Sequence, residues 1–300
     1  MMKIFHSDRF VPRLPDGHRF PIQKYQLIRE QLLYEGTLTE DQLEEATPIS
    51  EEEVLRVHDR SYWSHFTQLT LDPRAVRKIG FPQSSELVDR SRRSCQGTLG
   101  AALHALEYGV AGNIAGGTHH AYEGHGEGFC LLNDLVITAK HLLFHKHAKR
   151  ILIVDLDVHQ GNGTAKMCAD DSRIFTFSMH GAQNYPLRKE VSDLDIPLDT
   201  FTEDPTYLAL LRETLPKLID QHMPDFILYQ AGVDVLATDK LGKLNLTHRG
   251  CQQRDAFVLE TAYKHQIPLA ICIGGGYSER VADTVEAHAH TFRTAVHIFA

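Results

Sequence analysis

One short apolar segment places three side chains that can hold a divalent metal ion at every second position. Asp155, Asp157 and His159 stand in ILIVDLDVHQGNG, and Asp234 ends a second apolar run, FILYQAGVD. Because side chains on a strand alternate between its faces, this spacing predicts that the first three residues project from one face. Buried carboxylates and imidazoles are very unfavourable unless a cation or hydrogen-bonding partners accompany them.

Asp157, His159 and Asp234 are therefore predicted to be metal ligands. Three protein ligands leave one position open for water and substrate, which is typical of a catalytic metal site. Nitrogen and oxygen ligation fits Zn²⁺, and it also fits Fe²⁺ or Co²⁺. An Asp–His hydrogen-bond network without any metal is the alternative interpretation of the same pattern.

Two further groups could carry out acid–base chemistry beside such a metal. His119 and His120 follow a Gly–Gly turn, and Tyr277 follows Gly274–Gly276 at the end of the apolar run PLAICI. Histidines can take a proton from water and return one to a leaving amine, while a tyrosine hydroxyl can donate to a developing oxyanion. Adjacent histidines and a tyrosine at a strand end also occur without function. With a metal that polarises a carbonyl, however, the set predicts amide hydrolysis.

The elements that must position these residues have the pattern of an α/β protein. Continuous apolar runs (RILIVDLDVH, SRIFTFSM, DFILYQAGVD, PLAICIGGG) predict parallel strands buried on both faces. Helices are predicted at about 23–34, 94–108, 133–147, 205–221, 247–264 and 278–297. This alternation predicts a parallel β-sheet with helices on both faces, and its polar clusters fall at the carboxyl ends of the strands. Residues 12–20 are expected to form a loop, and the acidic stretch 39–60 a solvated helical face.

The composition narrows the class of protein further. No repeat or linker divides the 300 residues, so we expect a single domain spanning 1–300, and the net charge of −8 makes nucleic acid an improbable partner. Five cysteines without a CxxC motif favour reduced thiols, and the sequence shows neither a signal-peptide core nor a membrane-length apolar stretch. We therefore expect a cytoplasmic location and no membrane partner. Several histidines are interpreted as scattered exposed residues: His145, His147, His288 and His290.

Ordered motifs then give the sequence a strong family likeness. GGTHHAYEGHGEGFCLLND, DLDVHQGNG, GVDVLATDKLG and GGGY occur in that order, and the likeness extends over nearly the whole chain. The chain resembles the histone deacetylase family, and most of all its class IV branch and bacterial relatives. The resemblance implies the arginase/deacetylase fold with zinc on Asp157, His159 and Asp234. It also implies that His119 and His120 are the tandem catalytic histidines, with His120 as general base and Tyr277 as transition-state donor.

The resemblance assigns expected roles to residues around this centre. Asp155 is expected to hydrogen-bond the first histidine, and together with Asp157 and Ser178 to bind a structural K⁺ or Na⁺. Gly128 and Phe129, in the GFC motif, match one wall of the tunnel that receives an acyl-lysine side chain. Tyr185, in HGAQNYP, is expected to form the opposite wall.

Three positions depart from the best-known class I pattern. Gln160 stands where a second histidine usually follows the metal ligand, and Asn162 replaces a carboxylate that would face His120. Thr118 replaces a bulky aromatic residue before the histidine pair. Asn162 lacks the charge that would raise the pKa of His120, so a neutral, base-competent His120 is easier to maintain. Thr118 leaves space beside the metal, which hints at acyl chains longer than acetyl.

The function expected from the sequence is a zinc-dependent hydrolase that removes acetyl or longer acyl groups from lysine ε-amines of proteins or peptides. The alternative substrate is a small acylated amine such as an acetylpolyamine, with the acidic segment 39–53 as a candidate gate. An arginase-like ureohydrolase would need a further carboxylate where Gly161 stands. A non-enzymatic module that binds acyl-lysine is less favoured, because the ligands and Tyr277 are all present.

Overall fold

The computed structural model describes residues 1–300, and one sheet of eight parallel strands organises the chain. The strands run across the sheet in the order β2-β1-β3-β8-β7-β4-β5-β6. All neighbouring pairs are parallel. The strands are β1 (Ile4–His6), β2 (Leu43–Glu45), β3 (Val110–Asn113), β4 (Ile151–Asp155), β5 (Ile174–Gly181), β6 (Leu194–Leu198), β7 (Phe226–Gln230) and β8 (Leu269–Cys272).

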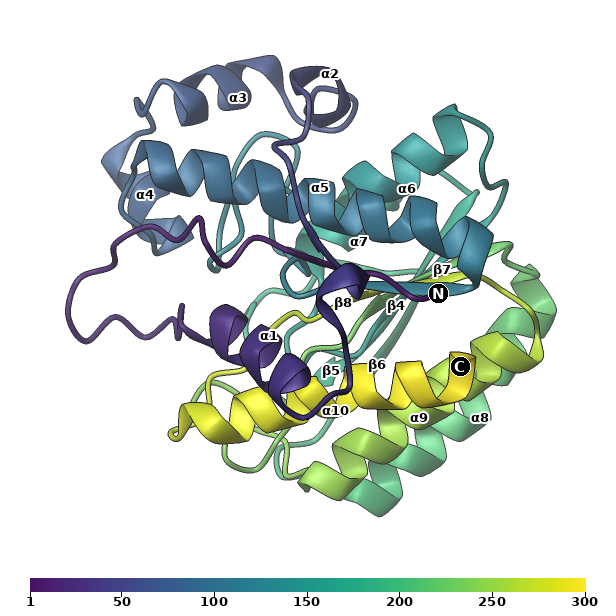
Figure 1. The fold of residues 1–300 in the computed structure, drawn as a ribbon. Coiled ribbons are helices and arrows are strands. Elements are labelled where there is room, and N and C mark those ends of the chain that lie inside the picture. Colours follow the sequence, from purple (N-terminus) through teal and green to yellow (C-terminus); the bar gives the residue numbers. More distant parts are fainter.

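Helices cover both faces of this sheet, as Figure 1 shows. On one side α5 packs against β1, β3 and β8 and also against α6, while α10 packs on the other side against β3, α1 and α9. The predicted α/β fold with helices on both faces is therefore confirmed. The helices are α1 (Lys24–Tyr34), α2 (Glu51–Val54), α3 (Arg60–Thr67), α4 (Pro73–Ile79), α5 (Ser85–Tyr108), α6 (Asp134–Phe144), α7 (Asn162–Cys168), α8 (Asp204–His222), α9 (His248–Lys264) and α10 (Val281–Phe299).

The central strands bring the ends of two predicted apolar runs together. β4 and β7 pair in parallel with Asp155 opposite Gln230, and every residue of both strands is buried. The loops that follow them therefore leave the sheet at the same edge. This register is what brings Asp157 and His159 close to Asp234, 75 or more residues further along the chain.

Four short strands were not predicted from the sequence. β2 lies inside the acidic stretch 39–60, where a solvated helical face was expected; that stretch instead contains a 3₁₀ turn, β2, the four-residue helix α2 and only the first residue of α3. β2 is an edge strand, and such a strand tolerates charged residues because one side remains open to solvent. Glu44 on it pairs with Lys3 at 2.7 Å.

The prediction that Asp155, Asp157 and His159 share one strand face was wrong in detail. β4 ends at Asp155, and the other two residues lie in the loop beyond it. In this loop, side-chain oxygens accept the backbone hydrogen bonds that a neighbouring strand would accept in the sheet. Asp155 Oδ1 accepts from the backbone N–H of Asp157 at 3.2 Å, and Asp157 Oδ1 accepts from the backbone N–H of His159 at 3.0 Å. The residues gather near the predicted site because these local bonds fold the loop back.

One histidine interpreted as exposed is fully buried. His288 lies on the inner face of α10, where Gly276 packs against its ring. Its burial was hidden in the sequence because the covering residue comes from the glycine-rich loop after β8. The five cysteines are all free and buried, and none of the helices is long and apolar enough to cross a bilayer.

A buried arginine ties the two ligand-bearing loops together. Arg254 of α9 is fully buried, and its Nη1 donates to the carbonyl oxygens of Leu156 at 3.1 Å and Gly232 at 2.6 Å. Its Nε donates to Asp255 Oδ1 at 2.8 Å. The bonded carbonyls lie one residue before Asp157 and two before Asp234, so this guanidinium holds both loops in register.

Replacing Arg254 with Met should lower the free energy of unfolding by about 3–5 kcal/mol, because the Asp255 carboxylate would remain buried without its cation. Urea denaturation followed by circular dichroism measures the change. The control is Arg212→Met on the exposed face of α8, which should stay within about 0.5 kcal/mol of the native protein. Equal stability of both variants would contradict the role given to Arg254.

Candidate active site and metal centre

The three predicted ligands meet at the carboxyl edge of the sheet. His159 Nδ1 lies 3.0 Å from Asp234 Oδ2 and 3.1 Å from Asp157 Oδ1. All three residues are buried, and their ligand atoms lie within 4.8 Å of one another. Tetrahedral zinc with bonds of about 2.0 Å separates its ligand atoms by about 3.3 Å. The three donors therefore have the spacing that such an ion requires.

Backbone groups orient the carboxylates in this cluster. The N–H of Val158 donates to Asp234 Oδ1 at 2.9 Å, and the N–H of Gly275 donates to Asp157 Oδ2 at 2.8 Å. A Cβ atom on Gly275 would overlap Asp234 Oδ2. The second of the three glycines before Tyr277 is thus required to let the backbone pass directly beside the ligands.

The charges of this cluster also fit a cation. Burial, followed by the charge of Asp157, raises the pKa of Asp234 to about 7. Burial lowers the pKa of His159, but the two aspartates outweigh it and raise that pKa to about 10. Two carboxylates buried side by side bind a positive charge strongly. A divalent cation neutralises both of them, whereas a proton neutralises only one. A zinc-type ion bound here would polarise an acyl carbonyl and lower the pKa of water.

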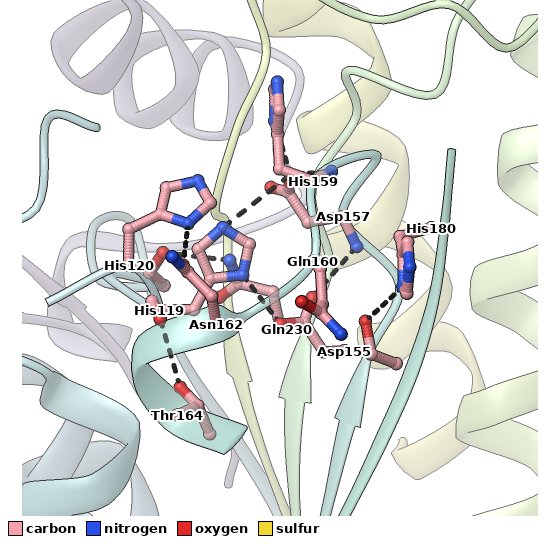
Figure 2. A network of polar contacts seen from close by, with 12 residues as sticks. His119, His120, Asp155, Asp157, His159, Gln160, Asn162, Thr164, His180 and Gln230 are labelled. Atoms are coloured by element: carbon pink, nitrogen blue, oxygen red, sulfur yellow. Dashed lines mark hydrogen bonds and ion pairs between the residues drawn. The ribbon is translucent and has the colours of Figure 1, made fainter. Parts of the chain in front are cut away.

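His119 and His120 lie beside this cluster in two different electrostatic environments (Figure 2). His119 Nδ1 is 2.6 Å from Asp155 Oδ2, and His120 Nδ1 is 2.7 Å from Asn162 Oδ1. Burial lowers the pKa of His119, but Asp155 and Asp157 outweigh it and raise that pKa to about 9. The two histidines, whose ring centroids are 4.2 Å apart, therefore cannot be treated as equivalent.

His120 is held neutral by its surroundings. Burial, followed by the positive charges of His119 and His159, lowers the pKa of His120 well below its ordinary value. Asn162 Oδ1 can only accept, so the Nδ1–H of neutral His120 donates to it. The Nε2 lone pair is then available as a base. The lowered pKa of His120 comes from burial and from the neighbouring histidines, whereas its hydrogen bond with Asn162 raises the pKa.

Glu127 organises this region, and the sequence reasoning did not single it out. Its Oε1 accepts from Asn162 Nδ2 at 2.7 Å and from the Tyr185 hydroxyl at 2.6 Å, while Lys78 pairs with Oε2. The bond to Nδ2 fixes which end of the Asn162 amide faces His120. Its position in the GHGEGFC motif, one residue before Gly128, was the signal that could have pointed to it.

A second carboxylate that was not singled out, Asp134, shapes the Gly–Gly–Thr turn before the histidines. It accepts from the backbone N–H of Gly117 at 2.9 Å and of Thr118 at 2.7 Å, and from the Thr118 hydroxyl at 2.6 Å. Both the backbone N–H and the hydroxyl of Thr118 are therefore engaged in hydrogen bonds within the protein. It lines an inner cavity of only about 40 Å³, which has room for one or two water molecules.

The predicted tunnel residues line a cavity of about 580 Å³ that leads outward from the centre. Gly128, Phe129 and Tyr185 form part of its wall together with His120, His159 and Tyr277. Gly128 and Phe129 both have positive φ angles, of 55° and 67°. A Cβ atom on Gly128 would lie 2.7 Å from His120 Cδ2, so glycine leaves space for the His120 ring.

Tyr277 also lines this cavity, at its inner end beside the ligand cluster. Its backbone N–H donates to Asp239 Oδ2 at 2.5 Å, and the buried Lys24 ammonium donates to the Gly274 carbonyl at 2.9 Å in the preceding loop. Burial, followed by the charges of Asp234 and Asp157, raises the pKa of Tyr277 well above its ordinary value. The phenol therefore remains a hydrogen-bond donor.

Two peripheral predictions have different outcomes. Ser178 is the cross-strand partner of Asp155, but its hydroxyl is 2.9 Å from His180 Nδ1. A monovalent cation at Asp155, Asp157 and Ser178 stays a prediction.

The expectation that residues 39–53 gate the tunnel was wrong. None of them lines the cavity, because β2 forms the sheet edge four strands away from β7.

Comparison with known proteins places this site in a family. A model of the histone deacetylase domain matches residues 18–292. The chain belongs to the histone deacetylase family. It is 29% identical over 282 residues to histone deacetylase 2 of Arabidopsis thaliana, covering 90% of this chain and 73% of the plant protein. Identity to the acetoin utilization protein AcuC of Staphylococcus aureus is 27% over 315 residues, with 97% and 80% of the two chains covered.

Other relatives agree with this membership. An uncharacterized protein of Picosynechococcus is 42% identical over 296 residues, 99% of this chain and 98% of the other. The fold matches the crystal structure of a histone deacetylase homologue complexed with SAHA, with a TM-score of 0.86 at 23% identity over 99% and 84% of the chains. This deacetylase is accordingly an amide hydrolase, and the family is generally zinc-dependent.

Asp234→Asn should remove about one equivalent of bound zinc per chain, because the amide neutralises one of two ligand carboxylates. Zinc content after dialysis, measured by inductively coupled plasma mass spectrometry, tests this loss. Asp220→Asn, on the exposed surface of α8, is the matched control and should keep the native content. A full zinc complement in the Asp234 variant would contradict the ligand assignment.

Proposed function

We propose that this protein is a zinc-dependent deacylase of N-acyl-lysine in proteins or peptides. The observation that carries the proposal is the placement of His119, hydrogen-bonded to Asp155, and His120, hydrogen-bonded to Asn162, beside the ligand cluster, with Tyr277 lining the same cavity as His120. A base, a second histidine held by a carboxylate and a hydroxyl donor are protein groups that amide hydrolysis can use. Asp157, His159 and Asp234 would hold the zinc ion, which would polarise the acyl carbonyl when bound.

The chain's own residues would act in a fixed order. His120 Nε2 accepts a proton from the water that adds to the acyl carbon, and the Tyr277 hydroxyl donates to the carbonyl oxygen as it becomes negative. The C–N bond then breaks, and the proton returns from His120 to the leaving amine. Asp155 keeps His119 protonated throughout, and Asn162 keeps the His120 ring oriented. The products are a carboxylic acid and the free amine.

The charge at the outer end of the cavity favours a peptide over an acetylpolyamine. Arg19, Arg77, Lys78 and Lys243 line it, and no Asp or Glu does. A polycation would be repelled there, and the acidic segment expected to serve as a gate lies elsewhere. The inner cavity of about 40 Å³ favours acetyl over long acyl chains, although Thr118 was expected to leave more space.

Other reactions fit the site less well. A two-metal ureohydrolase centre would need a carboxylate two residues after His159, where Gly161 stands. A Cβ atom there would overlap Asp155 Oδ2, so the position cannot accept a longer side chain in this arrangement. A binding module without catalysis would have no use for a base and a hydroxyl donor that face the same point.

The zinc-loaded protein should release acetate from an acetyl-lysine peptide, and much less from acetylspermidine. Tyr277→Phe should lower kcat by about 10²- to 10³-fold, because one oxyanion donor is lost, while zinc content stays unchanged. Liquid chromatography of the peptide and metal analysis provide the two measurements. Full activity in the Phe variant would remove Tyr277 from the mechanism. Stoichiometric zinc without acid release from any acyl-lysine peptide would refute the proposed function.

A further inference from the structure

The outer end of the cavity, here called the tunnel mouth, is strongly basic. Its exposed cations come from three separate segments: Arg19 from the loop before α1, Arg77 and Lys78 from the end of α4, and Lys243 from the loop between β7 and α9. No carboxylate lines the cavity. This concentration of positive charge stands on a chain whose net charge is −8, so it does not follow from the overall composition.

Most of this charge is not neutralised within the protein. Lys78 pairs with Glu127, whereas Arg19, Arg77 and Lys243 form no ion pair with any carboxylate. The only hydrogen bond of the Lys243 ammonium is to the carbonyl oxygen of Gln183, at 3.1 Å. Three free cations around one opening produce a positive potential that attracts an anionic partner.

We infer that the tunnel mouth recognises acyl-lysine that is flanked by acidic residues, an inference that rests on the proposed function and names its substrate class. The acyl end must pass Phe129 and Tyr185 to reach His120. The cations lie outside these walls, so they face the polypeptide on either side of the lysine. The negative charge therefore belongs to neighbouring Asp or Glu side chains of the substrate, and not to the acyl group.

Two peptides with the same central acetyl-lysine test this inference, one with two Glu on each side and one with two Lys. The zinc-loaded enzyme should favour the acidic peptide by roughly tenfold in kcat/KM, mainly through KM, because two or three exposed ion pairs each contribute about 1.4-fold to fivefold. The ratio should be large at about 0.01 M salt and approach one at about 1 M, where screening is strong.

Reversing the charge at the mouth provides the decisive variant. Arg77→Glu combined with Lys243→Glu should invert the preference, while Arg212→Glu combined with Arg249→Glu, on exposed positions of α8 and α9, changes the net charge equally and should not. A preference retained in the first variant, or equal turnover of both peptides by the native enzyme, would overturn the inference. Turnover of neither peptide would instead reject the proposed function.

An independent cluster lies on the surface between α2 and α6. Glu53 of α2 meets His141 of α6 and His145, the residue that caps the C-terminal end of α6. His141 Nδ1 is 2.9 Å from Glu53 Oε2, and His145 Nε2 is 3.8 Å from Glu53 Oε1. The His147 ring lies 6.2 Å and 6.0 Å from the rings of His141 and His145. His145, interpreted as scattered from the sequence, thus lies beside a carboxylate, and His147 lies near the two histidine rings.

The structure assigns a second divalent metal site to Glu53, His141 and His145. One ligand atom from each of the three residues lies within 4.8 Å of the others. Imidazole and carboxylate donors suit Zn²⁺, and an ion there would link α2 to α6. Arg56 also donates to Glu53, at 3.0 Å, and competes with the metal for this carboxylate.

Zinc titration of the 300-residue protein, followed by metal analysis, should give about two equivalents per chain. Glu53→Gln combined with His145→Ala should give about one, with deacylase activity unchanged. Arg56→Gln should bind the second equivalent more tightly in calorimetry, because the competing cation is gone. A native stoichiometry of one, or two equivalents retained in the Glu53/His145 variant, would refute this site.

Discussion

The structure depends on keeping two carboxylates and an imidazole together at a buried site. Asp157, Asp234 and His159 are each buried, and His159 Nδ1 lies 3.0–3.1 Å from one oxygen of each aspartate, which is short for groups whose charges must be balanced. Parallel pairing of β4 with β7 brings the loops together, and Arg254 clamps the carbonyls of both. The Gly275 backbone then fixes the remaining oxygen of Asp157. Each of these contacts restricts the ligands before any ion binds, which is how a protein makes a metal site selective in geometry.

The same charges set the chemistry of the neighbouring histidines. Asp155 hydrogen-bonds His119 and raises its pKa, and the charge of His119 in turn lowers the pKa of His120. A carboxylate in place of Asn162 would raise the pKa of His120, because its charge favours the protonated ring. Glu127 is two hydrogen bonds away from His120, and it accepts hydrogen bonds from both the Asn162 amide and the Tyr185 hydroxyl of the tunnel wall. The catalytic base and the tunnel wall are therefore parts of one hydrogen-bonded network, and a change at Glu127 would reach both.

Much of this centre was accessible from the sequence because the buried strands and their polar ends leave a strong pattern. The runs ending at Asp155 and Asp234 predicted both the sheet and the site. What escaped prediction depends on long-range contacts. β2 is polar because it is an edge strand, and the burial of His288 depends on a glycine loop far from α10 in sequence. Glu127 looks like an ordinary charged residue until the fold places Asn162 and Tyr185 on either side of its carboxylate.

Charge at the mouth and charge at the centre have opposite signs, and this separation has a consequence for substrate choice. The acidic ligand cluster lies at the base of the cavity, whereas Arg19, Arg77 and Lys243 surround its outer end. The family likeness accounts for the first, since the reaction requires it. It does not account for the second, because the rim contacts the parts of the substrate that differ from one target to another. Selection among acylated substrates therefore depends on exposed cations whose individual contributions are small and sensitive to salt. Chemistry and selection can accordingly change independently in this fold.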